Sequence, residues 1–455
     1  MKTRMNFKDE FYQKLKLLVL PIAIQNFMLA LVSATDAIML GWIDQTSLSA
    51  VSLAGQVQFV LSLFISGIAA GAGIMAAQYW GKQDAASIEK VIPIALRTNL
   101  LFSGLFTILA GFCPEMLMRI FTNDAPLVAS GSQYLRAVAL SYVLCGISQV
   151  YLILLKNTGH AAVSSRISST AVVLNIILNA ILIYGLCGAP ALGIRGAAYA
   201  TVAARVVELI WAYLETKKPE RVRILWNRLF SSAGKILSED FWRYTLPVLA
   251  ASLVWGIAYV LYSVIMGHMG SDAVAANSIT SIAKSLLSCL IRGVSGGAGV
   301  LIGNLLGANE LEKAREYGGR LSHLSIAIGI VTGGLLMLIS PAIVHFAPLS
   351  DTAAEYLQYM LLFCGLNLMA QSVNTTVLDG IFCAGGDAKF DMQGNIGAMW
   401  CFSVPLGFLA AFWLKLPVMV VYCIVNLDEI VKLPAVYHHY KKYIWVRNIT
   451  RDVED

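Results

Sequence analysis

The side chain with the clearest chemical potential in this sequence is Asp36. It lies in the stretch S-A-T-D-A-I-M-L-G-W (33–42), within an otherwise almost wholly apolar run that begins near Leu15. A bare carboxylate at membrane depth costs free energy unless it is neutralised or hydrogen-bonded. Such a group can load and release a proton, or hold a small cation through oxygen ligands. We interpret Asp36 as an ion-coupling residue; the alternative is a structural aspartate, hydrogen-bonded near the outer interface of the membrane.

Three amide side chains have the spacing to accompany this carboxylate. Gln25 precedes Asp36 by three helical turns, so the two share one helix face. Asn175 and Asn179 lie one turn apart in a second apolar run. If these faces meet, Asp36 gains amide hydrogen-bond donors. We therefore predict one ion-coupling site formed by these four residues.

A second group of polar and aromatic residues recurs at three- and four-residue steps, and therefore lies along single helix faces. The group comprises Trp255, Tyr259 and Tyr262 in one predicted helix, and Asn367, Gln371 and Asp379 in another. Aromatic rings attract cations, and a few polar groups orient a ligand in a cleft. We predict that these residues bind a flat, amphipathic, cationic substrate; the alternative is that the aromatic stripe only packs helices together.

Two cations lie on one face of another predicted helix, Lys284 and Arg292. They would repel a cationic substrate unless they pair with Asp379, which would create an ion-pair switch in this half of the chain. Alternatively, they bind an anionic or zwitterionic substrate, or Lys284 extends to the aqueous edge of the membrane. We count both among the predicted substrate-binding residues.

Composition indicates the elements that position these groups. Of the 455 residues, 58% are hydrophobic and 13% are charged, whereas soluble chains carry about 25% charged residues. A helix needs about 20 apolar residues to cross roughly 30 Å of hydrocarbon. The sequence predicts an all-α membrane protein with twelve transmembrane helices, near 15–40, 50–77, 91–113, 130–156, 163–187, 194–215, 244–268, 279–305, 319–343, 353–380, 390–413 and 417–437.

Alternate loops between these spans differ in charge, and the basic set marks the cytoplasmic side. This places both termini in the cytoplasm of a multi-pass protein of the inner or plasma membrane, with Asp36 in the outer half of its helix. The same distribution accounts for the net charge of +6 without nucleic-acid binding. Asp428, Glu429 and Lys432 fall near the cytoplasmic end of the last predicted span, where we expect local pairing and interfacial solvation.

The two halves of the chain repeat each other. A shift of 226 positions aligns Pro21 with Pro247 and the glycine pair Gly67, Gly71 with Gly293, Gly297. An even number of spans separates the copies, so we predict two six-helix lobes related by a parallel pseudo-two-fold axis. The predicted boundaries are an N-lobe at 1–215, a basic cytoplasmic linker at 216–243, a C-lobe at 244–440 and a cytoplasmic tail at 441–455. Two such lobes enclose a cleft that can open alternately to either side.

Motifs follow one family pattern along nearly the whole chain. The first half contains D-A-I-M-L-G (36–41) and G-A-G (71–73), and the second half contains G-A-G (297–299) and A-G-G-D (384–387). The stretch 157–201 includes N-T-G-H-A, L-N-I-I-L-N-A-I-L-I-Y-G and A-L-G-I-R-G-A-A-Y-A-T. In these motifs the chain resembles the prokaryotic multidrug and toxic compound extrusion (MATE) transporters, more closely the DinF-like than the NorM-like type.

The resemblance implies export of organic, cationic and amphipathic compounds in exchange for inward H⁺ or Na⁺. Asp36 matches the family's aspartate in the first helix, and Pro21 matches the proline at which that helix bends. Asn179 stands where the family has a second acid, and Phe382 and Cys383 stand where an arginine often occurs. The seventh predicted span has no glutamate, unlike NorM-like members. These departures leave the coupling ion open between H⁺ and Na⁺.

Other classes of function lack their motifs. The Gly81-Lys82 pair has alanine at position 76, so the phosphate-loop pattern is incomplete and ATP use is not expected. The 8 cysteines are scattered singly without metal-ligand spacing. We expect no enzyme activity and no cofactor, a small-molecule substrate, a lipid bilayer around the chain and a monomer. The remaining alternatives are a flippase for lipid-linked sugars or other anionic substrates, and a membrane sensor or scaffold.

Overall fold

The computed structural model describes residues 7–224, 226, 229, 234–347 and 349–452. Every regular element in these ranges is helical. The chain divides into two compact units: Phe27–Leu249, here called the N-unit, and Met1–Asn26 together with Ala250–Asp452, here called the C-unit. The division falls inside α1 (Phe7–Gly41) and inside α8 (Lys235–Gly267).

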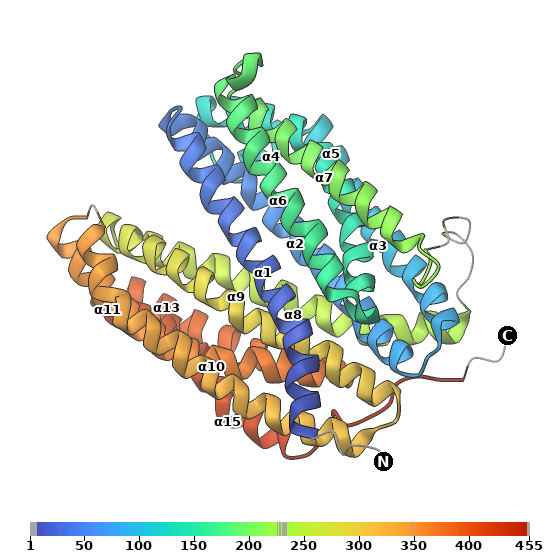
Figure 1. The fold of residues 1–455 in the computed structure, drawn as a ribbon. Coiled ribbons are helices and arrows are strands. Elements are labelled where there is room, and N and C mark those ends of the chain that lie inside the picture. The colour runs from blue at the N-terminus through green and yellow to red at the C-terminus, as the bar shows by residue number, and fades with distance from the viewer. Residues whose placement is uncertain (1–6, 225, 227–228, 230–233, 348, 453–455) are drawn as a thin grey trace. The chain divides into compact units, whose positions relative to one another are not determined.

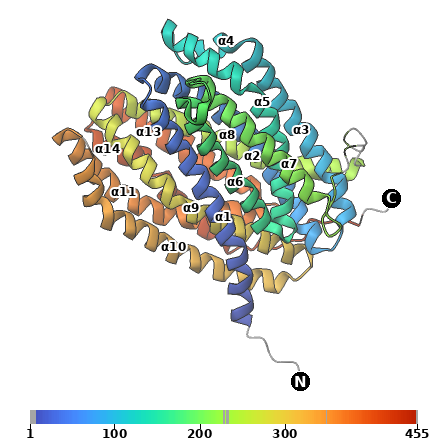
Figure 2. The same cartoon turned by 45° about the horizontal axis from the view of Figure 1, so that its top comes forward.

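Within the N-unit, α5 is the central helix and packs against α2, α3, α6 and α7. The views in Figures 1 and 2 both show α2, α3, α5 and α7 running side by side. The bounds of these helices are Gln45–Gly81 for α2, Ala85–Phe112 for α3, Pro114–Arg119 for α4, Ala125–Leu155 for α5, Ala161–Tyr184 for α6 and Ile194–Thr216 for α7.

Within the C-unit, α9 and α11 pack against each other and against α10. The bounds are Ser271–Gly307 for α9, Leu311–Phe346 for α10, Asp351–Thr375 for α11, Ala388–Asn395 for α12, Val404–Phe408 for α13, Val418–Val425 for α14 and Asp428–Tyr440 for α15. Three π-helical segments, Thr376–Phe382, Ile396–Ser403 and Leu409–Trp413, continue the last turns of α11, α12 and α13.

Ten of the described helices are long and apolar enough to cross a membrane. One of them, Ala125–Tyr184, contains two of the predicted spans. The two spans are separated at Gly159, which has a φ of +82° and divides α5 from α6. The predicted span 417–437 is not one helix: α14 ends at Val425, and α15 begins at Asp428. The described chain is therefore all-helical and apolar as predicted, while twelve spans remain a prediction.

The repeated glycines bring helices into close contact in both units. A Cβ atom on Gly67 of α2 would lie 2.9 Å from Cα of Leu249, and a Cβ atom on Gly293 of α9 would lie 3.0 Å from Cα of Ala23. These two contacts are related by the same shift of 226 positions that aligns the sequence halves. The leading part of α8 thus packs in the N-unit as the leading part of α1 packs in the C-unit.

The predicted lobes at 1–215 and 244–440 follow the order of the chain, whereas the compact units exchange the leading parts of α1 and α8. Positions 225, 227–228 and 230–233 of the predicted linker, and 453–455 of the predicted tail, lie outside the described residues.

Residues 441–452, here called the terminal strap, dock against the C-unit. Trp445 is 0% exposed and packs against Gly318 and Gly385. Arg447 donates hydrogen bonds to the carbonyl oxygens of Gly385 and Gly386, at 2.7 and 2.6 Å. The strap therefore covers the A-G-G-D motif and the neighbouring end of α10.

Candidate functional site

A chain of side-chain hydrogen bonds joins α1, α6 and α7 in the N-unit. Asn179 Nδ2 donates to Asp36 Oδ1 at 2.6 Å and to Asn175 Oδ1 at 3.2 Å. Asn175 Nδ2 in turn donates to Thr201 Oγ1 at 3.3 Å. Three of the four residues of the predicted ion-coupling site thus come together, and Thr201 extends the chain.

The carboxylate is held by helix packing as well as by this amide. Asn175 and Asn179 are buried, whereas Asp36 is half-buried. Near the end of α1, the hydroxyl of Tyr184 on α6 donates to the carbonyl oxygen of Met39 at 2.7 Å. None of the ion pairs found among the described residues involves Asp36. Among the described residues, Asp36 is therefore hydrogen-bonded by the amide of Asn179 and is not paired with a cation.

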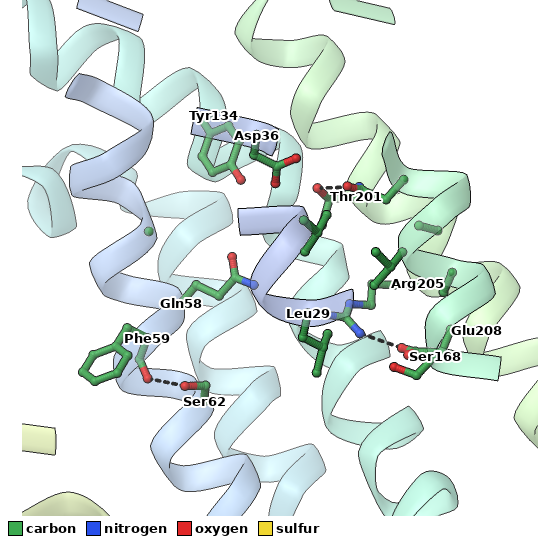
Figure 3. Close-up of a pocket in the computed structure, with 16 residues that line it drawn as sticks. Leu29, Asp36, Gln58, Phe59, Ser62, Tyr134, Ser168, Thr201, Arg205 and Glu208 are labelled. Carbon is green, nitrogen blue, oxygen red and sulfur yellow. Dashed lines mark hydrogen bonds and ion pairs between the residues drawn. The ribbon is translucent and has the colours of Figure 1, made fainter. Parts of the chain in front are cut away.

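Asp36 lines a pocket of about 500 Å³ that lies wholly within the N-unit. Figure 3 shows Asp36 beside Tyr134 at one end, with Gln58 of α2 further along and Arg205 and Glu208 toward the other end. Apolar side chains such as Leu29 and Val172 line the pocket together with these polar groups. The pocket thus combines apolar and polar walls, as small-molecule sites do.

Gln25 does not line this pocket. It lies in the part of α1 that belongs to the C-unit, since the division falls after Asn26. Gln25 and Asp36 both lie in α1, as the helical spacing predicted, but the two ends of α1 pack in different units. Gln58 supplies an amide to the pocket instead, and a glutamine inside the apolar run of α2 was a signal that sequence reasoning missed.

Pro21 also lies inside α1, in the part assigned to the C-unit. Five residues further along, the side chain of Asn26 donates to the carbonyl oxygen of Ile22 at 2.9 Å. The role of Pro21 as a bending point stays a prediction.

An ion pair on α7 forms a second polar wall of the pocket, and sequence reasoning missed it. Arg205 Nη1 lies 2.7 Å from Glu208 Oε2, and both residues line the pocket. Arginine and glutamate three residues apart within an apolar span were the available signal, because such residues inside a membrane are rare unless they pair.

The aromatic residues predicted to bind substrate lie on α8 in the C-unit. Trp255 and Tyr259 stack, with ring centroids 5.6 Å apart and an interplanar angle of 18°, and both rings are exposed. Tyr262 instead packs against the buried residues Ile265 and Ala410. The geometry suits ring-face contact for the first two residues and helix packing for the third.

The predicted cations and polar residues of the C-unit are only partly brought together. Lys284 Nζ donates to Asn367 Oδ1 at 2.9 Å, and Asn367 Nδ2 donates to the carbonyl oxygen of Asn426 at 2.6 Å, in the gap between α14 and α15. Arg292 and Asp379 are exposed, and among the described residues no ion pair joins Asp379 to either cation. Asp379 lies in the π-helical segment after α11, and Gln371 is half-buried on α11 itself.

A buried polar cluster surrounds Lys432 on α15. Lys432 is 5% exposed, and its Nζ lies 3.2 Å from Glu429 Oε1, 3.1 Å from Asn395 Oδ1 and 3.8 Å from Asp428 Oδ2. Local pairing was expected here, but solvation at the interface was wrong for Asp428 and Lys432, which are buried. The break between α14 and α15 explains the difference, since it turns the first residues of α15 toward α11 and α12.

Comparisons with known proteins point in one direction. The model of the MatE family matches residues 21–181 and 247–409. Similar proteins include the "Uncharacterized transporter YisQ" of Bacillus subtilis (strain 168), 21% identical over 94% of this chain and 93% of that protein. The "Probable multidrug resistance protein YoeA" of the same organism is 21% identical over 99% of this chain and 98% of that protein. The "Probable multidrug resistance protein NorM" of Agrobacterium fabrum is 25% identical over 84% of this chain and 83% of that protein.

Solved structures share the fold. The outward-facing conformation of a multidrug resistance MATE family transporter of the MOP superfamily has a TM-score of 0.85 and 19% sequence identity, over 95% of both chains. A MOP superfamily transporter from Pyrococcus furiosus gives a TM-score of 0.85 at 19% identity and the same coverage. The two segments matched by the family model begin 226 residues apart, which is the repeat found in the sequence.

Proposed function

Because this chain belongs to the MatE family, we propose that it exports organic, cationic and amphipathic compounds by antiport with inward H⁺ or Na⁺. Membership of this family identifies the chain as a multi-pass membrane transporter of the multidrug efflux type and not as an enzyme. The proposal adds the substrate class, the exchange and the residues that perform it.

The observation that carries the proposal is the hydrogen bond from Asn179 to Asp36 at the wall of a pocket of about 500 Å³. An ionised Asp36 attracts a cationic substrate, and a protonated Asp36 does not. Ion and substrate therefore compete for one carboxylate, which is the requirement for exchange in opposite directions. Alternating access by rocking of the two lobes would then carry each occupant across the membrane.

We propose H⁺ as the coupling ion. Asn179 presents an N–H group to Asp36, whereas hard metal cations are bound by several oxygen atoms. A proton needs only the carboxylate itself.

The test is dye efflux from proteoliposomes under an imposed H⁺ gradient or an imposed Na⁺ gradient, each alone. We expect a fluorescent cationic dye to move with the H⁺ gradient, and Asp36→Asn to abolish this movement while the protein stays folded. Asp44→Asn is the matched control: Asp44 is exposed and caps α2, and hydrogen bonds from Ser47 hold its pKa below its usual range. Unchanged gradient-driven efflux by Asp36→Asn would refute the proposal.

Two cationic side chains on α9 favour a second candidate function, which is the flipping of lipid-linked sugars or other anionic substrates. Arg292 is exposed on α9, and Lys284 is half-buried on the same face. A flippase would bind an anionic lipid headgroup in the presence and in the absence of an H⁺ gradient, so the same proteoliposomes separate the two functions.

We also propose a DinF-like subtype, residence in the inner or plasma membrane with both termini in the cytoplasm, and a monomeric state. Substrate contact by Trp255 and Tyr259 is supported by their exposed, stacked rings, which suit a flat cation.

A further inference from the structure

The pocket wall formed by α7 carries a carboxylate that the ion-coupling site does not use. Glu208 Oε2 accepts from Arg205 Nη1 at 2.7 Å and from Ser148 Oγ of α5 at 3.0 Å. The side chain of Glu208 is 0% exposed and that of Arg205 is 20% exposed. The pair is thus built into the contact of α5 with α7 while it also lines the pocket.

The other carboxylate oxygen, Glu208 Oε1, is buried without a hydrogen-bond donor among the residues that the structure describes. An ionised carboxylate has about four lone-pair sites, and a buried acceptor without a donor is unfavourable. Arg205 supplies the opposite charge at contact distance, so the pair balances its own charge. Glu208 Oε1 is therefore an acceptor that no donor among the described residues occupies.

Glu208 and the Asp36 site lie at different ends of the pocket, as Figure 3 shows. Thr201, which the asparagines connect to Asp36, and Glu208 are seven residues apart on α7, about 10 Å along the helix axis. Apolar side chains such as Val172 and Ala204 also line the pocket. The pocket offers a charged acceptor at one end and a charge-compensated acceptor at the other.

From this arrangement we propose that Glu208 selects substrates that carry an N–H or O–H donor on the far side of an apolar body from their cationic group. The cationic group pairs with Asp36, and the donor bonds to Glu208 Oε1. Because Arg205 already balances the charge of Glu208, a neutral donor binds there without leaving a net charge. The inference rests on the proposed export of cationic compounds and names the chemical class of the substrate.

The test compares two rhodamine dyes of the same ring frame, one with N–H ethylamino groups and one with both nitrogens fully alkylated. Binding to the purified protein in detergent is followed by fluorescence anisotropy, with no ion gradient. We expect the wild-type protein to bind the N–H dye about tenfold more tightly, the effect of roughly one hydrogen bond to a charged group.

Two variants change the acceptor in different ways. The double variant Arg205→Met with Glu208→Met replaces the ion pair by apolar residues of similar length, which buried pairs often tolerate. In this variant we expect the preference for the N–H dye to fall below about threefold while the affinity for the alkylated dye stays within about twofold. Glu208→Gln keeps the shape of the side chain but leaves the charge of Arg205 unbalanced, so we expect it to weaken the binding of both cationic dyes and also to reduce the preference. Asp36→Asn should weaken both dyes alike and keep the preference.

Three results would overturn the inference: no preference in the wild-type protein, a preference that the double variant retains, or an equal loss of both dyes in the folded double variant. The last result would make the ion pair a structural link between α5 and α7. Failure of H⁺ coupling in proteoliposomes would instead count against the proposed antiport and leave the binding preference unaffected.

Discussion

At Asp36, one amide hydrogen bond positions the carboxylate. Asn179 Nδ2 lies 2.6 Å from Oδ1 and is itself buried, so its orientation is fixed by Asn175 rather than by water. A donor of this kind stabilises the ionised carboxylate, which is the form that attracts a cation. The asparagine therefore acts through Asp36 and serves as a positioning residue.

Asn179→Ala removes this donor and leaves the carboxylate in place. We expect the affinity for a cationic dye to fall about tenfold, because a hydrogen bond to a buried charged group contributes about 1.5–3 kcal/mol. Dye binding to the purified protein measures the change. Asn175→Ala, which loses only the indirect link, should change the affinity less than about threefold. Equal effects of the two substitutions would show that the amide chain acts as one structural unit.

Among the elements, the terminal strap has the contacts of a structural component rather than of a loose tail. Trp445 is fully buried, stacks on Tyr440 with ring centroids 5.7 Å apart, and lies against glycines on either side. Asn448 Nδ2 donates to the carbonyl oxygen of Gly307 at the end of α9. The strap thus ties together the ends of α9, α10 and α15.

Trp445→Ala should destabilise the C-unit by about 3–5 kcal/mol, the usual effect of emptying a buried tryptophan site. Thermal unfolding of the purified protein measures it. Trp413, which is 84% exposed, provides the matched substitution, and Trp413→Ala should leave the unfolding temperature almost unchanged. If both variants unfold at the same temperature, the strap does not contribute to stability.

The sequence predicted the helices well because their apolar runs are long and their breaks are marked by polar residues and glycines. It also predicted the meeting of Asp36 with Asn175 and Asn179. It did not predict that Gln25 would fall in another unit, because helical spacing says nothing about which neighbours each end of a long helix contacts. The gap between α14 and α15 was missed for a similar reason, since it is stabilised by Asn367 from a distant part of the chain.

At the scale of the whole molecule, the same close contact between two helices occurs once in each unit. The contact of Gly67 with Leu249 in the N-unit and the contact of Gly293 with Ala23 in the C-unit are copies of each other, 226 positions apart. In both, a glycine without a side chain lets two helix backbones approach, as helices in lipid often do. The repeat in the sequence is therefore also a repeat in packing.

Gly293→Val should lower the free energy of unfolding by about 1–3 kcal/mol, because its Cβ would press on the backbone of Ala23. Chemical or thermal unfolding in detergent measures the loss. Gly334→Val is the control, since a Cβ at Gly334 of α10 would meet no atom within 4 Å. A Gly293→Val protein as stable as this control would rule out the close approach of α1 and α9.

The exchange of leading helix segments has a consequence for biosynthesis. Once the ribosome has delivered Leu249, every residue of the N-unit exists, whereas the C-unit joins Met1–Asn26 to a segment that ends at Asp452. Phe11 is made about 300 residues before its ring partner Tyr317, which lies at a centroid distance of 4.8 Å. The segment before Phe27 must therefore wait in the lipid for its neighbours, and the C-unit can be completed only after the whole N-unit has been made.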